Sequence, residues 1–577
     1  MEKTVGYCAL VQADVTSPPP YKALSYTWDA VPAGRQIVVD GQAFFVRRNL
    51  EKALRRFRAA TEEVWLWVDA IYINQNDVHE RSRHFAYMHR VYEEAEEVVI
   101  WLGDAADDSH FLLRQLYEFH DAMCSEAAAD TFHHWQSLFQ SGGFIKALAK
   151  LLGRRWWTKM WTMQESVCAR SLSLYCGPDK ISQQMLYSLG AVAEREAHSP
   201  LLTSTHNVDI GNYTQIGILQ EFQSLHRGST PVDLEQTLKL VRLRGVTDLR
   251  DKVYAVLNIC TSQEWPIRPD YGKSPSRVFT EVAQHLITST RSLSILSSCE
   301  YPGYPIRQDF LRQDRQLSSV VGLPTWVPDW TRTRLSAPLV QDYGVPLVDK
   351  TEDPHHADGG AIACYEFQGQ CLKVKGFVYD EIADCCPIFV GPSPNCFAQM
   401  NSAQIYRQLL DWISTRDLNR ILDSLDRTEL LFRTLTGNLM GNTHAGFQKV
   451  DDEGVAAFSN WLMTDGDEQI SYGLLRVILK TSHFRRLIVT KRGFLGLAHV
   501  CAKPVDNICI FLGASVPLII RTSHPIYIHD KEKCTVHKMV SDCHFNGCFK
   551  GKMMVDTQRC NMLVGDCCKH DNRIRDR

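Results

Sequence analysis

Two carboxylates, Asp69 and Glu165, are the side chains best suited to chemistry on a bound ligand. Asp69 follows a short apolar stretch that predicts a buried strand, where a carboxylate can orient a ribose or act in acid–base catalysis. Glu165 lies among aromatic residues, which can raise the pKa of a carboxyl group by excluding water. Structural roles are favoured for both: hydrogen bonds to loop amides or an arginine pair for Asp69, and a partly buried, hydrogen-bonded side chain for Glu165. They stay candidate catalytic residues only.

Further polar residues follow Asp69. Asn74 and Gln75 could bind a polar ligand, although ordinary turn hydrogen bonds are the favoured explanation. Asp77 and Glu80 have the spacing of a helix capping box, which accounts for both. Five tryptophans are interpreted mainly as core residues, with a platform for stacking a flat base as the alternative: Trp28, Trp67, Trp101, Trp157 and Trp161.

The stretch 64–103 contains the elements that would position these residues. Val64–Val68 predicts a strand buried on both faces, and Val98–Leu102 predicts a second apolar strand. The loop AIYINQN and a helix capped by Asp77 join them. Strands joined in this way form a right-handed parallel crossover, so we expect them to be neighbours in one sheet. Ligands bind beyond the carboxyl ends of parallel strands, which is where Asp69 lies.

Flanking elements complete an α/β domain around a mostly parallel sheet. Upstream, residues 36–46 predict a hairpin with an Asp-Gly turn, and Asn49 is expected to cap a helix with one apolar and one basic face. The basic face is interpreted as solvated rather than as an anion site. Downstream, helices are expected at 111–123 and 135–152. A closing helix then has one stripe made of Trp157, Met160, Trp161, Gln164 and Cys168.

Three blocks of this sequence resemble the fungal heterokaryon incompatibility (HET) domain. They are YKALSYTW at 21–28, WVDAIYINQNDVHERSRHFAYMHRVYEEAEEVVIWLG at 67–103, and RRWWTKMWTMQESVCA at 154–169. Three separated blocks in the right order are a specific match, and the domain would span 21–169. Weaker similarity to the wider protein type continues at 248–259, 269–279, 326–330 and 485–497.

The family's motif positions fall in these blocks and in the helix after the first of them. They are Tyr21, Ala23, Leu24, Ser25, Tyr26, Trp28, Asn49, Leu50, Trp67, Asp69, Ile73, Asn74, Gln75, Asp77, Glu80, Arg81, Met88, Tyr92, Ala95, Trp101, Leu102, Gly103, Trp157, Trp161, Gln164 and Glu165. Two positions depart from the family pattern: Tyr72 stands where Cys is usual, and Asp29 where Gly is usual.

The resemblance implies a protein of fungal non-self recognition that triggers growth arrest or programmed cell death after incompatible individuals fuse. Its α/β domain, distantly similar to the TIR fold, would be the effector, and its partners would be other proteins of that response. One alternative is a TIR-like enzyme that cleaves NAD at its glycosidic bond, with a carboxylate stabilising the oxocarbenium-like charge. Another is an assembly module without catalysis, and a non-enzymatic protein is favoured. No cofactor is expected, apart from NAD under the enzyme alternative.

The rest of the chain predicts two further regions. Residues 1–175 hold the HET-like domain, 176–340 predict mainly helices, and 341–577 predict a mixed, β-containing region. Asp248 and Ser274 are expected to cap helices, the latter with Pro275 at the first position. The tail has no CxxC pair, so we assign no metal ligands there. It is rich in cysteine and histidine: Cys534, Cys543, Cys548, Cys560, Cys567, Cys568, His537, His544 and His570.

Bulk composition is that of an ordinary globular protein. The chain has 577 residues, 45% of them hydrophobic, and a net charge of −3, which gives no general attraction to nucleic acid. The N-terminus lacks the apolar segment of a signal peptide, and the longest apolar run, 508–520, is too short to span a membrane. We therefore expect an intracellular, cytoplasmic protein. Phosphate-loop, HExxH, GxSxG and kinase motifs are all absent from the sequence.

Overall fold

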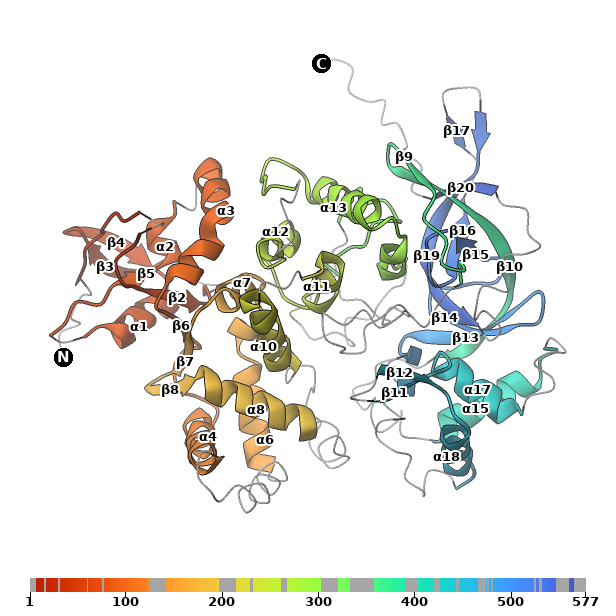
Figure 1. The fold of residues 1–577 in the computed structure, drawn as a ribbon, viewed down its shortest axis with the longest axis horizontal. Helices are drawn as coiled ribbons and strands as arrows, with labels where there is room; N and C mark the ends of the chain where they lie inside the picture. The colour runs from red at the N-terminus through yellow and green to blue at the C-terminus, as the bar shows by residue number, and fades with distance from the viewer. Residues whose placement is uncertain are drawn as a thin grey trace. The chain divides into compact units, whose positions relative to one another are not determined.

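The computed structural model describes most of the chain, in two compact units formed by residues 1–273 and 274–577 (Figure 1). The described residues are 7–14, 17–29, 32–59, 61–74, 77–123, 142–196, 214–228, 232–260, 267–301, 320–332, 357–389, 403–418, 426–442, 446–464, 474, 477–478, 481–523, 526–528, 532–545 and 560–564. Gln75 therefore lies outside them, as do the predicted helical residues 135–141 and part of the Cys-rich tail. The three-region division at residues 175 and 340 stays a prediction.

A five-stranded sheet forms the centre of the first unit, with the order β5-β2-β6-β7-β8. Four strands run parallel: β5 (Leu66–Trp67), β2 (Lys22–Tyr26), β6 (Glu97–Trp101) and β7 (Leu172–Cys176). The fifth, β8 (Asp179–Ser182), is antiparallel to β7. This confirms an α/β region with a mostly parallel sheet. Neither β7 nor β8 was predicted from the sequence.

The predicted pairing of residues 64–68 with 98–102 was wrong in one respect, because β2 lies between β5 and β6. Ala23 of β2 is opposite Trp67 on one side and Val98 on the other. The last four residues of β2 are buried, which suits an inner strand. By contrast β5 is only two residues long, and Val64 before it is 42% exposed, as befits an edge strand. The crossover is therefore parallel but skips one strand.

The segment after β5 is helical sooner than the sequence indicated. A short helix, α2 (Asp69–Tyr72), replaces the first part of the predicted loop, and α3 (Val78–Glu94) follows. Asp77 caps α3 as predicted, since its carboxylate accepts from the amides of His79 and Glu80. Glu80 does not close a capping box, because its side chain accepts from the amide of Asn74 at 3.0 Å and fixes the preceding loop instead.

One face of the sheet is covered by α1 (Arg48–Phe57) and by the hairpin β3 (Arg35–Val39) and β4 (Gln42–Val46), which pairs with β1 (Tyr7–Cys8). The hairpin turn at Asp40 and Gly41 has positive φ at both residues, as a type I′ turn requires. Asn49 does not cap α1, contrary to the prediction. The carboxylate of Asp29 accepts from the Asn49 amide at 2.6 Å, so this departure from the family pattern supplies the cap.

The other face of the sheet meets η1 (Arg155–Thr158) and α7 (Trp161–Val167). The predicted closing helix is thus divided by a turn at Lys159 and Met160, and Trp157 lies on the earlier piece. Two further helices of this unit contact α7: α10 (Thr214–Arg227) and α12 (Asp251–Leu257). The unit also contains α4 (Ser109–Met123), α6 (Gly142–Leu152), α8 (Gln183–Glu196) and α11 (Leu234–Leu240). Arg250, rather than the predicted Asp248, occupies the N-cap of α12.

The second unit begins with α13 (Pro275–Thr290), which Ser274 caps as predicted. Its main sheet closes on itself, because the long strand β10 (Cys371–Phe389) pairs with both β15 (Asn507–Phe511) and β13 (Arg485–Thr490). Further strands of this sheet are β9 (Tyr365–Gln368), β14 (Leu495–His499), β16 (Leu518–Thr522), β19 (Val536–Phe545) and β20 (Cys560–Val564).

Three helices pack together beside this sheet: α15 (Ala403–Ser414), α17 (Arg427–Leu435) and α18 (Asp452–Met463). Two short hairpins complete the unit, β11 (Leu439–Asn442) with β12 (Gly446–Lys449), and β17 (Ile526–Ile528) with β18 (Glu532–Cys534). This confirms the predicted mixture of strands and helices. Among the described residues of both units, no helix combines the length and apolarity that crossing a bilayer requires.

Candidate functional site

Asp69, the first candidate, lies at the carboxyl end of β5, where α2 begins. Its carboxylate accepts from its neighbour's amide, Ala70, at 2.7 Å and from the indole of Trp28 at 3.2 Å. The hydroxyl of Tyr26 also donates to it. Burial raises the pKa of Asp69 to about 6, although these three hydrogen bonds act to lower it. The carboxylate is therefore held by residues that immediately follow or end parallel strands.

Glu165, the second candidate, lies on α7 and is 7% exposed. It accepts a hydrogen bond of 2.5 Å from the hydroxyl of Ser25 on β2. Ser25 in turn accepts from the indole of Trp156 at 2.8 Å. This chain of bonds ties the closing block of the sequence to the opening block, 140 residues away. Burial, together with a smaller effect of the charge of Asp69, raises the pKa of Glu165 to about 8, and the bond from Ser25 opposes both.

The two carboxyl groups share one electrostatic environment. The charge of Asp69 acts on Glu165, and both charges act on Tyr26 and Tyr92, whose pKa values are raised well above normal first by burial. Charges interact this strongly only when they lie close together and little water is present to screen them. Asp69 accepts from Tyr26 and Glu165 accepts from Ser25, which are consecutive residues of β2, so both carboxyls lie near the carboxyl end of that strand although they are 96 positions apart in the sequence.

This arrangement has a chemical consequence. At neutral pH Glu165 would be mainly protonated and Asp69 mainly ionised, because their pKa values are about 8 and about 6. Two carboxyls whose pKa values are driven apart can serve as a proton donor and a charged stabiliser. Each also satisfies a structural role by its hydrogen bonds. The two described cavities lie elsewhere, one lined by residues of α8 and α10 and the other beside Glu93.

Residues 21–165 match a protein family described as "Heterokaryon incompatibility protein (HET)". The chain carries a HET domain. A curated relative, "Heterokaryon incompatibility protein 6, OR allele" of Neurospora crassa, is 28% identical over an alignment 606 positions long, which spans 89% of this chain and 88% of the relative. The two findings support a role in fungal heterokaryon incompatibility. No solved structure was found to match the chain, so the distant similarity of the HET domain to the TIR fold stays a prediction.

Two of the five motif tryptophans of the HET domain, Trp101 and Trp157, are buried as predicted, whereas Trp28, Trp67 and Trp161 are partly exposed. Trp101 is 2% exposed and donates from its indole to the side chain of Asn49 at 3.0 Å. Trp157 is equally buried, and Trp67 packs edge-on against Tyr92. The remaining motif residues are mainly apolar core residues or hydrogen-bond partners. Buried ones are Ala23, Leu24, Leu50, Ile73, Met88, Ala95 and Leu102. Tyr21 donates to the carbonyl of Val91.

Two motif residues have settings that the sequence did not indicate. Gln164 is completely buried, and within the described part of the chain neither atom of its amide has a hydrogen-bond partner. An unsatisfied buried amide costs about 1–3 kcal/mol. Gly103 has φ near 100°, which other residues rarely adopt, and Arg154 donates to the carbonyls on both sides of it, Leu102 and Asp104. The position therefore needs glycine for its backbone conformation.

A second buried carboxylate cluster was missed by the sequence interpretation. Asp251 on α12 accepts from the indole of Trp161 at 3.0 Å and from the hydroxyl of Tyr271 at 2.5 Å. Burial raises the pKa of Asp251 to about 6. The guanidinium of Arg81 lies 4.8 Å from the Tyr271 ring centre. The signal for this cluster was the weak similarity at 248–259 and 269–279. The bond between Trp161 and Asp251 shows that residues beyond the HET match pack against its closing block.

Trp161→Ala is expected to lower the free energy of unfolding by about 2–3 kcal/mol. The side chain stacks on Phe85 with ring centres 4.7 Å apart, and it keeps some exposure, so the cost falls below that of a fully buried tryptophan. Thermal and urea denaturation of the full chain would measure it. An unchanged melting profile would show that Trp161 does not contribute to the core and would favour a ligand-stacking role.

Proposed function

We propose that the HET domain is the effector of an incompatibility response, and that it triggers growth arrest or programmed cell death after incompatible fungal individuals fuse. The protein would act in the cytoplasm, with other proteins of that response as its partners. The segments after the domain would restrain it or sense a partner. The supporting observation is the similarity to the Neurospora crassa relative, which extends over 89% of this chain rather than over the HET domain alone.

A second candidate function is cleavage of NAD, and the paired carboxyls favour it. Asp69 would remain charged and could stabilise positive charge that develops on a ribose, while the neutral Glu165 could hold or donate a proton. Burial of Glu165 behind its bond to Ser25 favours instead a non-catalytic domain that assembles with other factors. NAD would be a substrate on the first of these interpretations and irrelevant on the second.

Inducible expression of the full chain in fungal cells tests this proposal. We expect growth arrest with the parent, and about tenfold or more survivors with Asp69→Asn, because loss of one stabilising charge typically costs at least that in rate. The full chain is needed, since a fragment ending at residue 175 would truncate β7 and remove β8. Counting surviving colonies at matched expression measures the effect.

Asp77→Asn is the matched control. It makes the same chemical change at a residue whose role is to cap α3, and asparagine caps helices as well as aspartate does. We expect this variant to arrest growth like the parent. A harmless parent chain would contradict the effector role. If Asp69→Asn arrests growth fully while folded by circular dichroism, the enzyme candidate is wrong. A fall in cellular NAD with the parent but not with Asp69→Asn would support it.

A further inference from the structure

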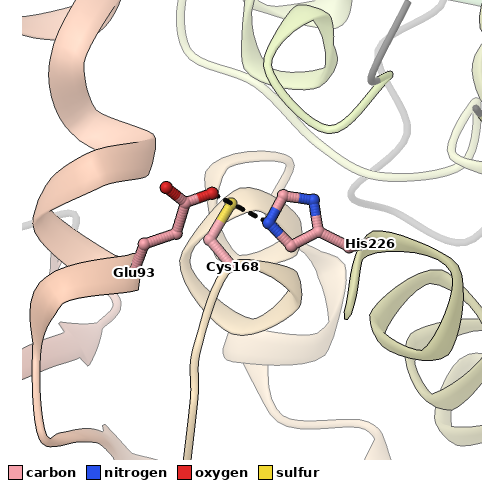
Figure 2. A group of neighbouring side chains, drawn as sticks. All are labelled: Glu93, Cys168 and His226. Atoms are coloured by element: carbon pink, nitrogen blue, oxygen red, sulfur yellow. Dashed lines mark hydrogen bonds and ion pairs between the residues drawn. The ribbon is translucent and has the colours of Figure 1, made fainter. Parts of the chain in front are cut away.

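Three side chains with metal-binding atoms converge away from the carboxyl pair: Glu93 near the end of α3, Cys168 at the end of α7, and His226 near the end of α10. Figure 2 shows the three pointing toward one another from separate elements. A carboxylate oxygen, the thiol sulfur and an imidazole nitrogen all lie within 4.8 Å of one another. Cys168 and His226 are 58 positions apart in the sequence, so only the fold unites them.

The present contacts of the group are few. His226 Nε2 lies 2.8 Å from the Glu93 carboxylate, and the side chains of His226 and Glu93 are 13% and 32% exposed. Cys168 is 3% exposed. Although burial opposes it, the hydrogen bond from His226 holds the pKa of Glu93 below its usual range.

A cavity of about 530 Å³ opens beside the group. Glu93, Cys168 and His226 form part of its wall, together with Glu94 and Arg170. Two arginines near the wall have other partners: Arg170 pairs with Glu94 at 2.8 Å, and Arg227 donates to the carbonyls of Ala169 and Arg170. The charges of His89 and Arg90, which lie near Glu93 on α3, also lower the pKa of its carboxyl group.

The donor set selects a class of ligand. Thiolate, imidazole and carboxylate together suit Zn²⁺, and three protein ligands with one position left to solvent are typical of open zinc sites. Zinc bonds of about 2.0–2.3 Å in a tetrahedron place ligand atoms about 3.3–3.6 Å apart, so shifts of about 1 Å would suffice. We propose that Glu93, Cys168 and His226 bind a Zn²⁺ ion whose fourth coordination position faces the adjoining cavity.

A bound metal ion would change the protonation of the Cys168 thiol. Burial raises the pKa of this thiol well above its usual value, and the charge of Glu93 raises it further. A bound cation reverses that effect, because a coordinating thiol loses its proton. Such a site would also join α3, α7 and α10, so zinc should raise the melting temperature of the protein. A Glu93–His226 ion pair beside an inert buried thiol is the competing explanation.

Metal titration of the purified full chain tests the proposal. The chain is stripped with a chelator and dialysed against excess Zn²⁺, and bound zinc is then counted against protein. Co²⁺ is used in parallel, because its thiolate charge-transfer band reports a sulfur ligand. We expect Cys168→Ser to bind about one zinc fewer per chain than the parent, and to show a weaker cobalt–thiolate band. His226→Gln, which can keep a hydrogen bond to Glu93, should lose the same zinc.

Cys260→Ser is the matched control, because Cys260 is also a buried thiol of the first unit and it donates a hydrogen bond to the hydroxyl of Thr237. This variant should bind as much metal as the parent. Comparison of each variant with the parent removes any contribution from the cysteines of the tail. Equal zinc content and equal cobalt spectra in the parent, Cys168→Ser and His226→Gln would overturn the proposal and leave the ion pair as the explanation.

Discussion

The parent is expected to lose folding stability as the pH rises from about 4.5 to about 8. Glu165→Gln is expected to remove most of this loss. The folded protein holds the proton of Glu165 up to a pKa of about 8, whereas the unfolded chain releases it near 4.5. The stability from this proton is therefore fully present below pH 4.5 and is lost as the pH rises through about 8. The expected loss from this one group is about 3–5 kcal/mol.

Urea denaturation of the parent and the variant at several pH values would measure this change in the free energy of unfolding. Glutamine cannot titrate, so the variant should be more stable than the parent near pH 8 and similar to it near pH 4.5. Asp69 and Asp251 remain in the variant, and their own raised pKa values of about 6 should leave a smaller slope between about pH 4 and pH 6. Glu118→Gln, at an exposed position on α4, serves as control. Identical pH profiles for parent and Glu165→Gln would contradict the buried, protonated carboxyl.

Trp156→Ala is the second substitution with a large expected effect, about 3–5 kcal/mol of unfolding free energy. Trp156 is 2% exposed, packs edge-on against Trp157 with ring centres 4.9 Å apart, and donates to Ser25. Its removal leaves a cavity between η1 and β2 and deprives Ser25 of a partner on the side away from Glu165. Thermal and urea denaturation of the full chain would give the change.

Two further variants separate the loss of packing at Trp156 from the effect of removing any tryptophan. Trp156→Phe should cost less than Trp156→Ala, because it restores part of the volume while still removing the indole donor. Trp65→Ala is the matched surface control, since Trp65 is 40% exposed beside the edge strand β5, and we expect it to cost well under half as much. A cost for Trp156→Ala as small as the one expected for Trp65→Ala would mean that burial of Trp156 does not stabilise the domain.

Local patterns predicted much of this fold correctly. The Asp-Gly turn, the capping of α3 by Asp77 and the capping of α13 by Ser274 depend on residues within a few positions of one another, so their chemistry is visible in the sequence. Strand order was different. β2 separates β5 from β6, and nothing in the periodicity of the crossover indicates that it skips a strand. The cap of α1 also escaped prediction, because Asp29 supplies it from 20 positions upstream.

In the candidate site, too, the local features could be predicted from the sequence and the long-range contacts could not. The carboxyl end of a parallel strand placed Asp69 correctly by a general rule of α/β folds. That Glu165 joins it depends on the bond to Ser25, a contact over 140 positions that residue types alone cannot specify. The group of Glu93, Cys168 and His226 was missed for a related reason: its donors come from three elements and have no metal-binding spacing in the sequence.

Asp69 and Glu165 lie close enough in the HET domain for the charge of Asp69 to raise the pKa of Glu165. Carbon-13 NMR of glutamate labelled at the side-chain carboxyl, with the Glu165 signal assigned by its loss in Glu165→Gln, measures this interaction. We predict that Glu165 titrates near pH 8 in the full-length parent, and at a lower pH in Asp69→Asn, because one neighbouring negative charge is gone. A Glu165 signal that titrates near pH 4.5, or one that does not respond to Asp69→Asn, would contradict the claim.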